Sequence, residues 1–109
     1  MGVTVETRQR FIGGMGTPSG WNASWPLAEV ALSDGQGRLR LRVPLLRFLL
    51  RPWLPDFEFD AATVEATPHR GVYSSGVRFA RPDGRSVVFW TFSPDEVLAA
   101  VADQRSQAA

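Results

Sequence analysis

The chain has 109 residues, with 12 basic side chains, 11 acidic side chains and a formal net charge of +1. This length is typical of a single domain, and the nearly balanced charge argues against nucleic acid as a partner. The absence of cysteine excludes disulfides, thiol catalysis and cysteine-based zinc sites. No signal peptide is recognisable at the start, and no apolar run is long enough to cross a bilayer. We therefore expect a cytoplasmic location.

The first quarter of the chain, residues 1–25, contains little regular patterning. Residues 3–12 alternate weakly between apolar and polar side chains, which predicts a strand. Residues 13–25 contain four glycines together with proline, serine and asparagine, all of which are frequent in loops. We therefore expect an N-terminal strand followed by a glycine-rich loop.

The clearest pattern is a β-hairpin formed by residues 27–33 and 38–43. Residues 34–37 read Asp-Gly-Gln-Gly, which favours a turn because these residues tolerate positive φ. A four-residue turn places one apolar row on one face and a glutamate opposite an arginine on the other. The expected register pairs Ser33 with Arg38, Leu32 with Leu39, Val30 with Leu41, Glu29 with Arg42, and Ala28 with Val43.

Residues 44–55 form an unusually apolar connector. They hold seven large apolar side chains and are bounded by Pro44 and Pro55. Arg47 and Arg51 lie four residues apart and would share one face of a helix. Three interpretations remain open for this segment: a third buried element or extra strand, a contact with a protein or a second copy, or a contact with a membrane interface.

The second half of the chain continues as short strands. Residues 57–60 and 63–67 are expected as strands, and residues 77–81 and 86–92 as a second hairpin around a loop at 82–84. That loop places Phe79 opposite Val87 and Val77 opposite Phe89. The only histidine, His69, is expected in a solvated loop, and no motif assigns it a catalytic or metal-binding role.

The chain ends with a strong helix signal. Ser93, Pro94, Asp95 and Glu96 provide an N-cap, a proline at the first position and two acids in the first turn. Apolar residues then recur at helical spacing. We expect a helix over residues 93–105, with a frayed tail beyond it.

Seven strands followed by one helix predict a mainly β fold. The expected architecture is a seven-stranded antiparallel barrel or sandwich capped by the C-terminal helix. The chain is expected to be one domain, residues 1–109, divided into an N-terminal strand and loop (1–25), the barrel (26–92) and the helix (93–105).

The sequence resembles small bacterial proteins with a pleckstrin-homology-like (PH-like) domain. The resemblance covers about residues 25 to 103 and rests on three motifs: Trp25-Pro26-Leu27-Ala28, Val77-Arg78-Phe79, and Val88-Phe89-Trp90-Thr91-Phe92-Ser93-Pro94. Members that bind phosphoinositides use basic residues around the first hairpin. The resemblance therefore makes Arg38 and Arg40 the candidate anion-binding residues.

No motif indicates catalysis, a metal site or a cofactor, so we expect a non-enzymatic module. The leading hypothesis is a PH-like interaction domain that binds a protein partner or itself. The alternative is peripheral binding to anionic lipid through the arginine-rich hairpin and the connector 44–55. The candidate interaction residues are Leu46, Arg47, Leu49, Leu50, Arg51 and Trp53.

Overall fold

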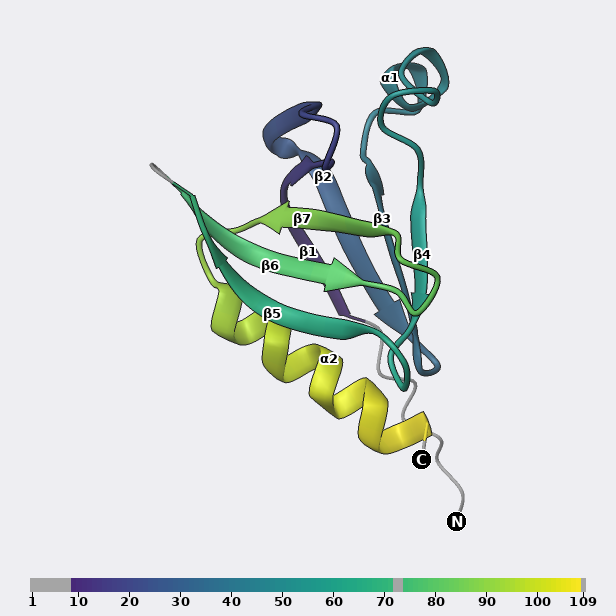
Figure 1. Cartoon of the computed structure of the whole chain (residues 1–109), viewed down its shortest axis with the longest axis vertical. Helices are drawn as coiled ribbons and strands as arrows, with labels where there is room; N and C mark the ends of the chain where they lie inside the picture. The colour runs from purple at the N-terminus through teal and green to yellow at the C-terminus, as the bar shows by residue number, and fades with distance from the viewer. Residues whose placement is uncertain (1–8, 72–73, 109) are drawn as a thin grey trace.

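The fold is a seven-stranded antiparallel sheet with two helices (Figure 1). The computed structural model describes residues 9–71 and 74–108. The expected mainly β class with a C-terminal helix is confirmed, and a short second helix is added. The strands are β1 (Gln9–Gly16), β2 (Asn22–Ser33), β3 (Gln36–Leu41), β4 (Phe57–Asp60), β5 (Glu65–Arg70), β6 (Ser75–Ala80) and β7 (Ser86–Trp90), and the helices are α1 (Pro44–Leu49) and α2 (Pro94–Ala108).

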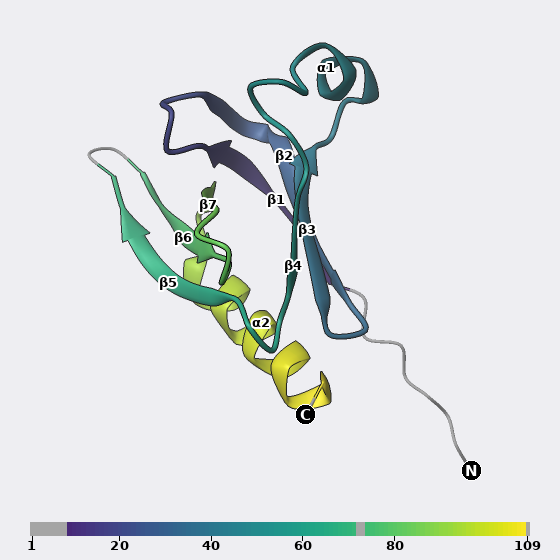
Figure 2. The same cartoon turned by 45° about the vertical axis from the view of Figure 1, so that its right-hand side comes forward.

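The strand order is β4-β3-β2-β1-β7-β6-β5, with the first strand of the chain at the centre. The sheet bends so that its two halves face each other, and α2 lies across the lower opening against β5, β6 and β2 (Figure 2). Strands β4 and β5 form the two edges of this order, so the sheet is not closed.

The core lies between the two halves of the sheet and α2. Phe59 and Phe79 stack at a centroid distance of 4.7 Å, which joins the two halves. Gly37 is required beside them, because a Cβ there would lie 2.2 Å from the Phe59 ring. Other members of the core are Val30, Leu32, Leu39, Leu41, Val77, Phe89, Val97 and Val101.

The first hairpin turns more tightly than expected. Asp34 and Gly35 have φ of 53° and 77°, the pair of positive values that defines a two-residue type I′ turn. Ser33 therefore faces Gln36, and the expected register, with Ser33 opposite Arg38 and Glu29 opposite Arg42, is wrong by two residues. A shift of two residues keeps every side chain on its own face, so the apolar alternation alone did not distinguish the two registers.

The glycine-rich region is mostly strand rather than loop. β1 extends to Gly16 and β2 begins at Asn22, so only residues 17–21 connect them, whereas a loop over 13–25 was expected. Gly13 shows the reason: a Cβ there would lie 2.0 Å from the Trp90 carbonyl oxygen. Glycine permits this close approach of neighbouring backbones. Part of the strand expected at 3–12 lies outside the described residues.

The second hairpin has the expected register, with Phe79 opposite Val87 and Val77 opposite Phe89. His69, however, is not in a loop. It lies in β5, opposite Gly76 of β6. Pro68 is compatible with this strand because β5 is at an edge of the sheet, where a proline need not remove a ladder hydrogen bond.

Helix α2 begins at Pro94 as predicted but extends to Ala108 instead of fading at 104–105. Two side chains attach its last turns to the sheet region. The Gln104 Oε1 atom accepts a hydrogen bond from the Gly35 N–H at 2.7 Å. The Arg105 guanidinium donates to the carbonyl oxygens of Ala61 and Val64 at 2.9 and 2.7 Å. These long-range bonds were not visible in the local helical pattern.

Candidate functional site

The connector between β3 and β4 projects from the end of the molecule opposite α2 (Figure 1). Its helix α1 follows Val43 and starts with Pro44, whose fixed φ suits the first helical position. No residue of α1 is buried. Leu54, just beyond it, is buried in the core and anchors the segment. The interpretation as a third buried element therefore holds fully only for Leu54, while Leu46 and Leu50 are partly buried and no residue of α1 is fully buried.

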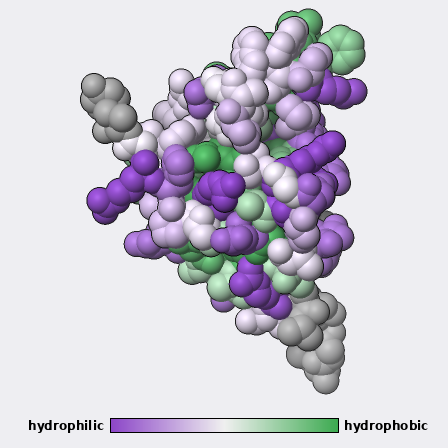
Figure 3. Space-filling view, viewed as in Figure 1, coloured by the Kyte–Doolittle hydropathy of each residue, from purple (hydrophilic) through white to green (hydrophobic). Residues whose placement is uncertain are grey.

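Exposed apolar side chains gather at this end of the sheet, and we call them the apolar tip. Phe48 is 70% exposed and Leu45 is 66% exposed. Trp21, from the β1–β2 loop, contacts Trp53 at a centroid distance of 5.4 Å. Figure 3 shows hydrophobic surface at the upper end, where α1 lies. The apolar tip consists of Trp21, Val43, Leu45, Phe48, Leu49 and Trp53.

The tip also carries positive charge without a matching carboxylate. Within residues 9–71 and 74–108, Arg42, Arg47 and Arg51 form no ion pair with any acid. Arg42 donates to the Pro26 carbonyl oxygen at 3.0 Å. Asp56 is the only acid in residues 42–56, which gives this segment an excess of arginine.

The predicted interaction residues therefore lie in or beside the tip but are not equally exposed. Leu49, Arg51 and Trp53 are open to solvent. Leu46 and Leu50 are partly buried against the core. Arg47 is also partly buried, and its Nε atom is shielded from water and has no hydrogen-bond partner within the described part of the chain.

The two candidate anion-binding residues, Arg38 and Arg40, lie elsewhere, on the outer face of β3. Arg38 forms an ion pair with Glu58. Arg40 Nε lies 3.2 Å from Glu29, which is almost fully buried and also contacts Arg10 at 3.3 Å. Each guanidinium thus already faces a carboxylate. The structure does not bring these two arginines together with the tip.

A concave surface of about 690 Å³ lies over these strands and the β6–β7 turn. Asp83 in that turn has a pKa below its ordinary value of 3.8, mainly because the backbone N–H of Arg85 donates to it. The neighbouring Arg81 guanidinium adds to this effect, while partial desolvation opposes it. Arg81 also donates to the Glu58 carbonyl oxygen and lies over the Phe57 ring. Arg38, Arg40 and Arg81 on this surface thus each face a carboxylate.

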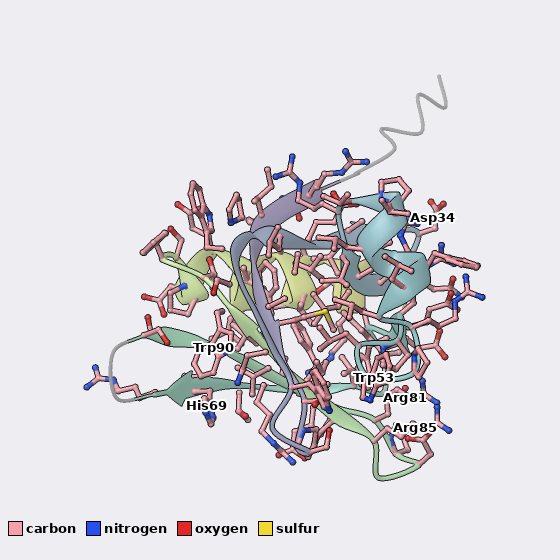
Figure 4. The ribbon with its side chains drawn as sticks, turned by 90° about the horizontal axis from the view of Figure 1, so that it is seen from above. Asp34, Trp53, His69, Arg81, Arg85 and Trp90 are labelled. Atoms are coloured by element: carbon pink, nitrogen blue, oxygen red, sulfur yellow. The ribbon has the colours of Figure 1, made fainter. Side chains whose placement is uncertain are left out.

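A second concavity of about 550 Å³ lies between the starts of β2 and β6 and the end of β7. Trp25, Trp90 and Phe92 line it, and His69 contacts Trp90 at a centroid distance of 5.4 Å. In Figure 4, Trp90 and His69 lie together and apart from Trp53. Sequence reasoning missed this pocket because its walls come from distant segments.

Neither a metal centre nor a membrane-spanning helix emerges in the described residues. No three His, Asp or Glu side chains among them gather in a way that could hold a metal ion. None of their helices has the length and apolar content needed to cross a bilayer. Comparisons of the chain with protein-family models, curated proteins and solved structures produced no match.

Proposed function

We propose that this chain is a non-enzymatic binding module that attaches to an anionic membrane surface through its apolar tip. The proposal includes the PH-like class and the cytoplasmic location expected from the sequence. The mainly β sheet with a C-terminal helix is the architecture that such a module requires. The observation that carries the proposal is the projection of exposed apolar side chains beside arginines that lack an acidic partner.

The apolar side chains provide the larger part of the expected binding energy. Burial of a large apolar side chain contributes roughly 1.5–3 kcal/mol. Leu45 and Phe48 are mostly exposed and gain little from the protein itself. Trp21 and Trp53, which contact each other, are also partly exposed, and tryptophan favours the boundary between lipid and water. Insertion of the tip into the interfacial region would bury these side chains.

The arginines add selectivity for negative charge. A basic side chain near an anionic leaflet contributes about 1 kcal/mol. Arg51 is exposed, so it can keep its aliphatic stem against apolar surface and its guanidinium in the polar layer. The nearby Asp56 offsets only part of this charge.

The shape of the tip favours a bilayer over the protein partner or second copy first expected from the sequence. A stable protein interface needs about 800 Å² from each partner and close shape complementarity. Helix α1 has six residues and projects from the end of the molecule. A lipid interface adapts to such a projection, whereas a protein partner would have to enclose it.

Sedimentation with lipid vesicles tests the proposal. Wild-type protein should pellet with vesicles that contain phosphatidylglycerol in phosphatidylcholine, and less with phosphatidylcholine alone, and added salt should weaken the binding. Phe48→Ser should lower partitioning about tenfold or more. The matched control is Phe92→Ser, which removes an aromatic ring that is 84% exposed but lies outside the tip.

The arginine contribution has its own variants. Arg51→Gln should lower partitioning to anionic vesicles about fivefold and leave binding to neutral vesicles unchanged. Arg78→Gln, on exposed β6 surface, is the control. Absence of pelleting at low salt would contradict the proposal. A dimer in light scattering that Phe48→Ser dissociates would instead assign the tip to a second copy of the chain.

A further inference from the structure

The pocket beside Trp90 is separate from the tip and has a fixed aromatic wall. The Trp90 Nε1 atom donates to Asn22 Oδ1 at 3.3 Å, and His69 makes an edge contact with the same ring. The indole thus has two side-chain contacts that restrict its position. Trp25, which is 55% exposed, and Phe92 meet edge to face at a centroid distance of 6.0 Å and form a second wall.

Glycines keep the Trp90 ring accessible. A Cβ at Gly71 would lie 3.2 Å from the far edge of the indole, and a Cβ at Gly16 would lie 3.0 Å from its Nε1 atom. Any larger residue at these positions would press on the indole. The concavity of about 550 Å³ falls within the range of sites for small molecules.

The lining is uncharged and mostly apolar, with one amide and four hydroxyl side chains among its residues. No Arg, Asp or Glu borders the pocket among the described residues. A charged ligand would lose hydration there without meeting an opposite charge. The polar lining consists of Asn22, Ser24, Ser74, Ser75 and Thr91.

We infer that this pocket binds a neutral saccharide. A sugar ring presents a face of C–H groups, which favours the electron-rich face of an aromatic ring. Its hydroxyl groups both donate and accept hydrogen bonds, as the serine and threonine side chains of the pocket do. An acyl chain offers no hydrogen-bond partner to these side chains, and a proline-rich segment offers carbonyl acceptors but few donors.

Nuclear magnetic resonance of the indole N–H groups tests this inference with glucose, N-acetylglucosamine, maltose and cellobiose as probes. At least one sugar should shift the Trp25 and Trp90 signals saturably and leave the Trp53 signal unchanged. Trp25→Ala and Phe92→Ala, both at exposed positions, should each lower the affinity about tenfold. Trp53→Ala should leave it unchanged.

Several outcomes would overturn the inference. One is the absence of a saturable shift with all four sugars, and another is unchanged affinity in both aromatic variants. Saturable shifts with a polyproline peptide and not with sugars would assign the pocket to a peptide. Vesicle binding by the tip does not enter this experiment, so the two proposals fail independently.

Discussion

At the end of the sheet that α2 covers, side chains form hydrogen bonds with elements that are distant in sequence. At the apolar tip, few such hydrogen bonds occur among the described residues. Gln104 reaches the turn of the first hairpin, and Arg105 reaches the segment between β4 and β5. Helix α1, by contrast, buries none of its residues. The comparison shows how stability and binding can be separated: one end holds the sheet together, and the other keeps its apolar side chains available.

Replacement of phenylalanine by alanine at two positions tests this separation and gives the largest expected change in the free energy of unfolding. Phe79 is fully buried in the core, and Phe48 is mostly exposed on the tip. Phe79→Ala should lower the free energy of unfolding by about 3–5 kcal/mol, because it leaves a cavity. Phe48→Ala should change it by less than about 0.5 kcal/mol. Urea denaturation measures both, and equal destabilisation would show that α1 is packed in solution.

A smaller effect is expected at the attachment of α2. Gln104→Leu keeps an apolar stem of similar size but leaves the N–H of buried Gly35 without its acceptor. We expect a loss of roughly 1–3 kcal/mol in the free energy of unfolding. Gln36→Leu, at an exposed position of β3, is the matched control. Similar losses in the two variants would mean that the bond to Gly35 contributes nothing specific.

The smallest effect concerns an exposed turn that belongs to neither end. The pKa of Asp83 is lowered in the folded state, so its carboxylate stabilises the fold above its ordinary pKa of 3.8. This contribution is lost as the pH falls through the lowered folded value. Asp83→Asn should therefore be slightly less stable than wild type at neutral pH and equally stable in strong acid. Thermal unfolding over a pH series measures this, and a difference that persists in strong acid would contradict it.

Local patterns predicted the fold class, and the second hairpin followed from its alternation and its turn. They failed where the local structure depends on a contact with a residue that is distant in sequence. The register of the first hairpin depends on whether its turn contains two or four residues. Apolar alternation does not distinguish two registers that differ by two residues. Gly13 looked like a loop residue because the Trp90 carbonyl that excludes a side chain there belongs to β7. The length of α2 depended on Gln104 and Arg105 in the same way.

The candidate site, like the fold, was only partly predictable from the sequence. The composition of residues 44–55 left burial, a protein contact and a membrane contact open, and the structure leaves every residue of α1 at least partly exposed. Trp21 was missed because only its packing against Trp53 joins it to the tip. Glu58 and Glu29 were missed as partners of Arg38 and Arg40, because strand register decides which charges meet.

The central position of β1 has a consequence for biosynthesis. Its neighbour β7 is the last strand of the described residues to be made, and their pairing joins Gly14 to Trp90. A nascent chain that has emerged only as far as β4 can form hairpins but not the junction between the two halves of the sheet. Completion of the sheet must therefore wait until β7 has left the ribosome. Contacts of such long sequence separation slow folding, so the junction between β1 and β7 should form late.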